Sequence, residues 1–320
     1  MRREQYFKRN TEVAGRSFDY HATGLQLLIG RLIVVAVLVA YQVLTALSVE
    51  LALVFLLTLL VVFPWLVIRS LRFNARVTSW GNVRFDFHRT YWEAVKVYIL
   101  LPVGVALTLY TTAPFLSRAR ARFTVGGHRI GDHRFGFAAP IGPFYKAFGL
   151  AILAGIGAFF VLSSALGASI AAAFQGMVDP TAAASDPAAQ AALVTGILLL
   201  YAMLFALIFV SVILYQALLR NPVFAGMSLD DGRGGTHRFV SNIHPGRFIW
   251  IVFSNALTTA LSLGLALPWA QIRLARYLAA HTFAVPDGPV DDIAGRIQSE
   301  ASAVGDAYTD FEGLDLGLPF

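Results

Sequence analysis

Six long apolar segments alternate with polar stretches along the chain of 320 residues. Crossing about 30 Å of hydrocarbon takes about 20 residues of helix, so each segment is long enough, or nearly so, to enter a membrane. A helix pairs its own backbone groups in lipid, whereas an isolated strand does not, so all six are predicted to be helical. The segments run approximately over residues 25–48, 51–68, 93–115, 146–172, 191–219 and 247–269.

The polar connections differ in charge. The connections 48–50 and 173–190 contain no Lys or Arg, whereas 69–92, 116–146 and 220–247 are rich in Arg. Lys and Arg accumulate in the cytoplasmic loops of membrane proteins. The three basic stretches are therefore predicted to lie in the cytoplasm.

This prediction conflicts with six plain spans, because alternation would place two of the basic stretches outside. The conflict disappears if segments 93–115 and 247–269 enter and leave on the cytoplasmic side. Both contain residues that suit a broken helix, Pro102 with Gly104 and Asn255 with Gly264. We favour four spans plus two re-entrant or strongly kinked segments over six spans. Either number is even, so the N- and C-termini are both predicted to be cytoplasmic.

Composition agrees with a membrane protein. Hydrophobic residues make up 57% of the chain and charged residues 14%, and the mean hydropathy is +0.65. Soluble domains are about 25% charged, so an ordinary soluble enzyme is excluded. The chain has a net charge of +6. Its basic residues lie between apolar segments, where they face anionic lipid. The predicted partners are membrane lipids with anionic headgroups, and no nucleic acid.

A short motif repeats after three of the apolar segments. A proline and an aromatic residue are followed by two arginines, and Phe-x-Phe follows at 85–87 and 135–137. The proline is predicted to end or kink the membrane helix, with the aromatic residue at headgroup depth. The arginines are then either simple interfacial anchors or a ring that binds headgroups or an anionic substrate. The motif comprises Pro64, Trp65, Arg69 and Arg72; Pro114, Phe115, Arg118 and Arg122; and Pro268, Trp269, Arg273 and Arg276.

The repeat predicts an all-α, polytopic helical membrane protein with six membrane-embedded segments in two tandem halves. We divide the chain into a basic cytoplasmic N-terminus (1–24), a first membrane half (25–137), a second membrane half (138–283) and an acidic cytoplasmic tail (284–320). The tail has an apolar stripe at helical spacing, which includes Ile293, Ile297 and Val304. It is predicted to dock as a helix on cytoplasmic loops of its own chain, near Arg118 to Arg134 or Arg69 to Arg76.

Few polar residues lie within the apolar segments. Arg31 is near the cytoplasmic end of the first segment, where it either snorkels to headgroups or marks a functional site. Asn255, Thr258 and Thr259 form a polar cluster in the last segment. They are predicted either to hydrogen-bond between helices or to contact a substrate in a broken helix.

The sequence offers no catalytic constellation. It has no cysteine, and the phosphate-loop, nucleophile-elbow and zinc-protease motifs do not occur. His128, Asp132 and His133 lie close together, but the flanking Arg129 and Arg134 would repel a cation. We therefore predict no catalytic, cofactor-binding or metal-binding residues, no cofactor, and no enzymatic activity.

Several motifs in the last third resemble the YjgN family of bacterial inner-membrane proteins, whose function is unknown. The resemblance covers nearly the whole chain, and Phe115 departs from it because Trp is more usual there. It implies a multi-pass protein of the bacterial inner (plasma) membrane, and it brings no functional residues. The motifs are Ser262-Leu263-Gly264, Leu267-Pro268-Trp269-Ala270, Arg273, Arg276-Tyr277, Gly235-Thr236-His237-Arg238-Phe239, Ala303-Val304-Gly305-Asp306 and Asp315-Leu316-Gly317.

Two functions follow as hypotheses. The tandem repeat with broken segments and a polar residue at mid-membrane is typical of a transporter or channel for a small solute or ion. The alternative is a non-catalytic membrane scaffold or lipid-organising protein, because the Asp and Glu residues all lie in loops, the tail or helix ends, where they cannot couple ions. The sequence specifies neither a substrate nor an oligomeric state.

Overall fold

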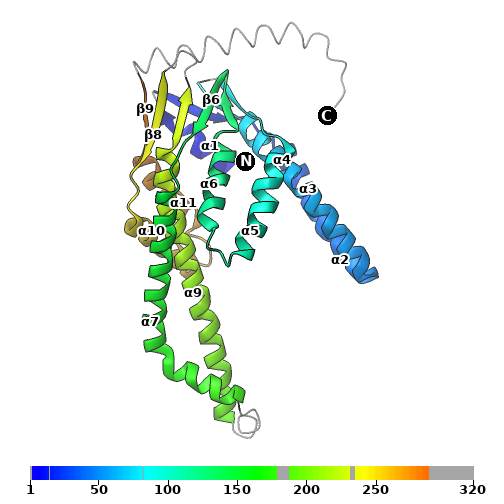
Figure 1. The fold of residues 1–320 in the computed structure, drawn as a ribbon, viewed down its shortest axis with the longest axis vertical. Coiled ribbons are helices and arrows are strands. Elements are labelled where there is room, and N and C mark those ends of the chain that lie inside the picture. The colour runs from blue at the N-terminus through cyan, green and yellow to red at the C-terminus, as the bar shows by residue number, and fades with distance from the viewer. Residues whose placement is uncertain (1, 14, 82, 179–186, 231–234, 288–320) are drawn as a thin grey trace. The chain divides into compact units, whose positions relative to one another are not determined.

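A computed structural model describes residues 2–13, 15–81, 83–178, 187–230 and 235–287 (Figure 1). The chain forms two compact units. The first contains Met1–Ala139, Val223–Ser241 and Ala279–Phe320, and the second contains Pro140–Pro222 and Asn242–Leu278.

Four helical segments are long and apolar enough to cross a membrane, and they coincide with four of the predicted segments. They are α2 (Gly24–Leu47), α3 (Val49–Arg76), the stretch Gly142–Ser164 of α7 (Gly142–Val178), and α9 (Pro187–Ala225).

Each of these helices pairs with its neighbour along the chain. Ser48 ends α2, because its N–H donates to the Leu44 carbonyl, and it caps α3, because its Oγ accepts from the Leu51 N–H. A Cβ at Gly155 of α7 would lie 2.6 Å from Ser211 Oγ of α9. A residue without a Cβ is therefore what lets α7 and α9 approach so closely.

The other two predicted segments are each a helix–turn–helix hairpin. The first hairpin consists of α4 (Tyr91–Val95), the π-helical η1 (Lys96–Leu100), α5 (Leu101–Leu107) and, after a turn, α6 (Ala113–Val125). The second hairpin consists of α10 (Pro245–Leu261) and α11 (Leu267–Ala280).

The two hairpin turns repeat the same conformation 154 positions apart along the chain (109 to 263). Leu109 and Leu263 have φ values of 48° and 50°, and Tyr110 and Gly264, one residue on, also have positive φ. The N–H of Tyr110 donates to the carbonyl of Val105, and the N–H of Gly264 donates to that of Thr259, both at 2.8 Å. Ala106-Leu107-Thr108-Leu109 and Ala260-Leu261-Ser262-Leu263 lead into the two turns, so the same local structure occurs twice on a nearly repeated sequence.

The basic stretches form a nine-stranded antiparallel sheet with the strands in chain order, so the all-α prediction is wrong. The stretches alternate apolar with polar residues around turn-forming glycines, as hairpin strands do. A short helix, α1 (Arg2–Arg9), precedes the sheet. The strands are β1 (Glu12–Val13), β2 (Arg16–Tyr20), β3 (Thr78–Trp80), β4 (Val83–Phe87), β5 (His128–Ile130), β6 (His133–Phe137), β7 (Met227–Asp230), β8 (Thr236–Ser241) and β9 (Thr282–Val285).

Each pair of apolar helices leaves the sheet from one strand and returns to the next. α2 and α3 connect β2 with β3, and α7 and α9 connect β6 with β7. The first hairpin connects β4 with β5, and the second connects β8 with β9. In all four cases the two strands are hydrogen-bonded neighbours, so the chain enters and leaves each helix pair at adjacent strands.

The sheet has a buried face and an open face. The side chains of Val83, Ile130 and Leu229 lie on the buried face. A row of stacked or tilted Phe rings crosses this face at centroid distances of 6.2, 6.4 and 6.0 Å. Because side chains alternate along a strand, the intervening residues point to the open face. The Phe row consists of Phe18, Phe85, Phe135 and Phe239, and the arginines of the open face are Arg84, Arg129, Arg134 and Arg238.

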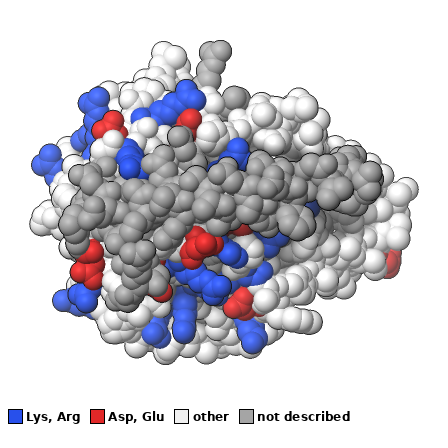
Figure 2. Space-filling view, turned by 90° about the horizontal axis from the view of Figure 1, so that it is seen from above, with Lys and Arg blue, Asp and Glu red and all other residues white. Residues whose placement is uncertain are grey.

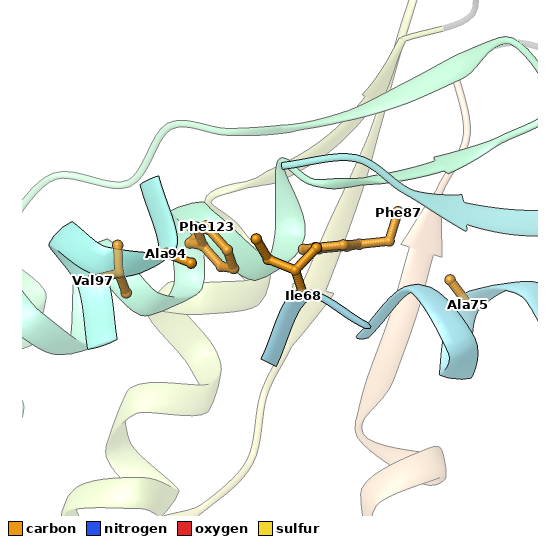
Figure 3. Close-up of a cluster of buried hydrophobic side chains, with 6 residues drawn as sticks. All are labelled: Ile68, Ala75, Phe87, Ala94, Val97 and Phe123. Carbon is orange, nitrogen blue, oxygen red and sulfur yellow. The ribbon is translucent and has the colours of Figure 1, made fainter. Parts of the chain in front are cut away.

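Phe87 joins the sheet to the helices of its unit. Its side chain is fully buried, and its ring lies 5.8 Å from that of Phe123 in α6. Ile68 and Ala75 of α3 and Ala94 of α4 belong to the same cluster (Figure 3).

The prediction that the motif proline ends the membrane helix is wrong. Helix α3 continues past Pro64 to Arg76, while Pro114 and Pro268 stand at the start of α6 and α11. Pro fits the first turn of a helix, where its missing N–H would have no partner. The predicted tail helix and its docking lie outside the described residues, except that Ala284 and Val285 belong to β9.

Candidate functional site

The first and third copies of the repeated motif place an arginine over a tryptophan in the same way. The guanidinium carbon of Arg69 lies 5.2 Å from the centre of the Trp65 ring, and that of Arg273 lies 5.3 Å from the Trp269 ring. Both Trp side chains are about half exposed. An aromatic ring with a cation above it is suited to the level of lipid headgroups. In the second copy Ala119 occupies the position of this arginine.

Two other arginines of the motif bind the main chain. Arg72 Nε donates to the Phe87 carbonyl at 3.2 Å, and Arg118 Nε donates to the Ala139 carbonyl at 2.7 Å. Both carbonyls lie where the chain leaves a strand. Arg72 and Arg118 therefore fasten helices to the ends of strands, whereas the Arg122 and Arg276 side chains are exposed.

Arg273 also meets the polar residues of the second hairpin. Its Nη1 donates to Ser254 Oγ at 2.7 Å and to Asn255 Oδ1 at 3.0 Å. Asn255 is 8% exposed, and its Nδ2 donates to the Ala270 carbonyl at 2.9 Å. The cluster thus links α10 to α11 inside a segment whose other side chains are mainly apolar.

The first hairpin lacks this cluster at the corresponding positions. Leu101 stands 154 positions before Asn255, and Ala119 stands 154 positions before Arg273. The two hairpins share their turn geometry, so the fold of a hairpin does not depend on the polar pair. An arginine held by a buried amide within a largely apolar hairpin is unusual and, in membrane proteins, usually serves a function, which makes Arg273 and Asn255 the candidate site.

The remaining predicted polar residues have other partners or positions than the Arg273–Asn255 contact. Thr258 Oγ1 donates to the Ser254 carbonyl of its own helix, and the Thr259 carbonyl accepts from the turn residue Gly264. Arg31 is exposed on α2. Sequence reasoning selected Arg273 and Asn255 separately and missed their contact. The signal was available, because both residues belong to one repeat unit and the other copy changes both.

Two aspartates in strands of the sheet, Asp19 in β2 and Asp86 in β4, have pKa values below the ordinary range. Asp19 accepts from Arg9 Nε at 2.8 Å, and this hydrogen bond is the main cause of its lowered pKa. Burial alone would raise the pKa of Asp86, but hydrogen bonds from the Phe87 N–H and Arg76 outweigh it. Both carboxylates therefore stay ionised near neutral pH and hold α1 and α3 to the sheet.

The histidine-rich stretch around β5 and β6 uses its rings to bind the main chain. His128 Nδ1 lies 2.7 Å from the Thr124 carbonyl, and His133 Nδ1 lies 2.9 Å from that of Asp230. Within the described part of the chain, no three His, Asp or Glu side chains lie close enough to hold a metal ion.

The hairpin tips expose apolar side chains. Leu109 is 86% exposed and Leu263 is 94% exposed. Apolar surface exposed to water costs about 25 cal/mol of free energy per Å². The same surface has no such cost when it contacts lipid.

A family model described as "Bacterial protein of unknown function (DUF898)" matches residues 1–311. The chain belongs to the DUF898 family. This DUF898 chain is similar to a protein of Salmonella typhimurium named "Inner membrane protein YjgN", with 25% identity over 316 residues. The match covers 87% of this chain and 78% of the relative, and it confirms the resemblance inferred from the sequence motifs. No solved structure matches the DUF898 chain.

Proposed function

We propose that this DUF898 protein is a multi-pass protein of the bacterial inner membrane that binds anionic lipid headgroups on the cytoplasmic side and organises lipid there, without catalysing a reaction. The observation that carries the proposal is the Arg273–Asn255 pair, with the Arg273 guanidinium over the Trp269 ring. A guanidinium held at membrane depth attracts phosphate, and the first hairpin indicates that the pair is not needed for folding. The "inner membrane" in the relative's name supports the location.

The proposed topology has four spans and two re-entrant hairpins. Each hairpin begins and ends at neighbouring strands of one sheet, so its two ends share one side of the membrane. Its arms are short. The longer arms, residues 91–107 and α10, have 17 residues each, or about 25 Å at 1.5 Å per residue, and α6 and α11 have 13 and 14 residues, or about 20 Å, against about 30 Å of hydrocarbon. The Arg-rich sheet favours the cytoplasmic side, and the exposed leucines at the tips then lie among acyl chains of one leaflet.

The lipid proposal is tested by exchanging the second hairpin's polar pair for the residues of the first. Asn255→Leu with Arg273→Ala recreates a pair that the same hairpin fold already accommodates, so the variant should fold. After purification from a membrane of phosphatidylethanolamine and phosphatidylglycerol, we expect the variant to retain at least tenfold less phosphatidylglycerol than the unmodified protein does. Native mass spectrometry measures the retained lipid.

The matched control for this experiment is Arg238→Gln, which removes an arginine from the sheet and leaves both hairpins unchanged. It should retain phosphatidylglycerol as the unmodified protein does. Equal lipid retention by the exchanged variant and the unmodified protein would show that the pair only links α10 to α11, and the lipid proposal would then fail.

Transport of a small anion is the second candidate. The specific observation in its favour is Asn255, which is buried in a hairpin broken at residues 262–266, as in transporters with discontinuous helices. Chloride efflux from proteoliposomes distinguishes the two candidates. Efflux that depends on Asn255 favours a transporter, and efflux no faster than from protein-free vesicles favours the lipid-organising role.

A further inference from the structure

The open face of the sheet combines a basic row with an apolar patch. The row consists of Arg84, Arg129, Arg134 and Arg238, and the patch consists of Val240, Phe283 and Val285, which are 42%, 48% and 48% exposed. Arg238 pairs across strands with Val285, and Val240 pairs with Phe283, so the row and the patch adjoin. Figure 2, a view from above, shows Lys and Arg side chains with a few Asp and Glu among them.

The acidic residues of the open face do not cancel the row. Glu12, Asp19, Asp86 and Asp230 share the face with the four arginines, but Asp19 and Asp86 are already bound by two further arginines, Arg9 and Arg76. An exposed apolar patch beside such a row is typical of a binding surface. An acidic amphipathic segment would match both parts of it.

The C-terminal segment starts at the edge of this face. Strand β9 is the last strand of the sheet, and Asp287 follows it directly. The Asp287 N–H donates to His237 Nδ1 at 3.0 Å, and its carboxylate accepts from the Thr236 N–H at 3.3 Å. These two bonds hold the chain against β8 at the point where residues 288–320 begin.

The sequence of residues 288–320 is complementary to the open face. It contains seven acidic residues and one arginine, which gives a net charge of −6. Ile293, Ile297, Ala301 and Val304 recur at helical spacing. The acidic residues are Asp291, Asp292, Glu300, Asp306, Asp310, Glu312 and Asp315, and the basic residue is Arg296.

We propose that residues 288–320 bind the open face of the sheet in the same chain. The apolar stripe would cover Val240, Phe283 and Val285, and the carboxylates would face the arginine row. Anionic lipid is a poor alternative surface because it repels a segment of this charge. A second copy is disfavoured because the tether at Asp287 keeps the chain's own segment at an effective concentration of about millimolar.

Disulfide trapping in the full-length protein tests this inference, since the chain contains no native cysteine. Cysteines are introduced in pairs, Val240→Cys with Ile297→Cys. Oxidation should form an intramolecular cross-link in most molecules. Cross-linking should fall at least fivefold when Asp291→Asn, Asp292→Asn and Glu300→Gln reduce the charge of the segment.

The matched control pairs Val240→Cys with Ser299→Cys, two positions away and on the opposite side of a helix from Ile297. This pair should cross-link at least fivefold less than the test pair. Equal cross-linking of the two pairs would mean an unspecific encounter and would overturn the proposal. Dimers in place of intramolecular products would assign the surface to a second copy, and insensitivity to the charge changes would remove the arginine row from the interface; either result contradicts the proposal as stated.

Discussion

A cysteine placed at Asp132, in the turn between β5 and β6, will react with a membrane-impermeant maleimide only after the inner membrane is opened. A cysteine at Val49, next to the short connection between α2 and α3, will react in intact cells. We expect the two positions to differ at least tenfold in labelling. The reason is the sheet: all nine strands are joined by hydrogen bonds, so they must lie on one side of the membrane, and their arginines favour the cytoplasm.

The second hairpin supplies a third position for the same experiment. A cysteine at Leu263, in the hairpin turn, should resist the maleimide from both sides, because a re-entrant tip lies in hydrocarbon. Labelling of Asp132→Cys in intact cells at the rate of Val49→Cys would instead establish six spans and refute the re-entrant hairpins.

The long apolar helices could be predicted from the sequence because length and hydropathy decide them locally. α2 contains no buried residue, so its character depends on lipid and not on contacts with distant residues. The basic charge of 116–146 and 220–247 conflicted with six alternating spans, and this conflict also contained information about topology. A segment that starts and ends in basic stretches is what a hairpin between two neighbouring strands produces.

The sheet could not be predicted because its strands are short and far apart in sequence. β4 and β5 pair Phe85 with Ile130 across a complete hairpin, and no local pattern specifies such a partner. The repeated Phe-x-Phe was nevertheless a strand signal, since alternate positions point to one face. Phe85 and Phe87 lie on the buried face and Asp86 on the open one. The abundance of arginine drew attention to the membrane surface instead.

The candidate site was predicted in its parts and missed as a whole. Asn255 and Arg273 stand 18 positions apart and meet only because the chain reverses at residues 262–266. One turn residue of the second hairpin is Gly264, a common sign of positive φ, but the first hairpin has Tyr110 at that place. The turn therefore does not require glycine at that place, and the available signal was the repeat of Ala-Leu-Thr/Ser-Leu at 106–109 and 260–263.

The largest stability loss is expected from Phe87→Ala. Phe87 is fully buried and packs against Phe123 and against His128, whose ring centre lies 5.0 Å from its own. Removing a large aromatic side chain from such a core costs about 3–5 kcal/mol. Thermal unfolding in detergent micelles should show a melting temperature lower by roughly 6 °C or more. Phe253→Ala, at a side chain that is 54% exposed, is the matched control and should lower the melting temperature clearly less.

Gly127 provides an independent check on the packing of Phe87. A Cβ on Gly127 would lie 2.4 Å from Cε2 of the Phe87 ring, so Gly127→Ala should destabilise the protein by displacing that ring. Phe87→Leu creates room at the same spot. The double variant should therefore be more stable than the sum of the two single losses predicts, by about 1 kcal/mol. Strict additivity would mean that Phe87 and Gly127 do not share a tightly packed contact, and the large loss expected for Phe87→Ala would lose its basis.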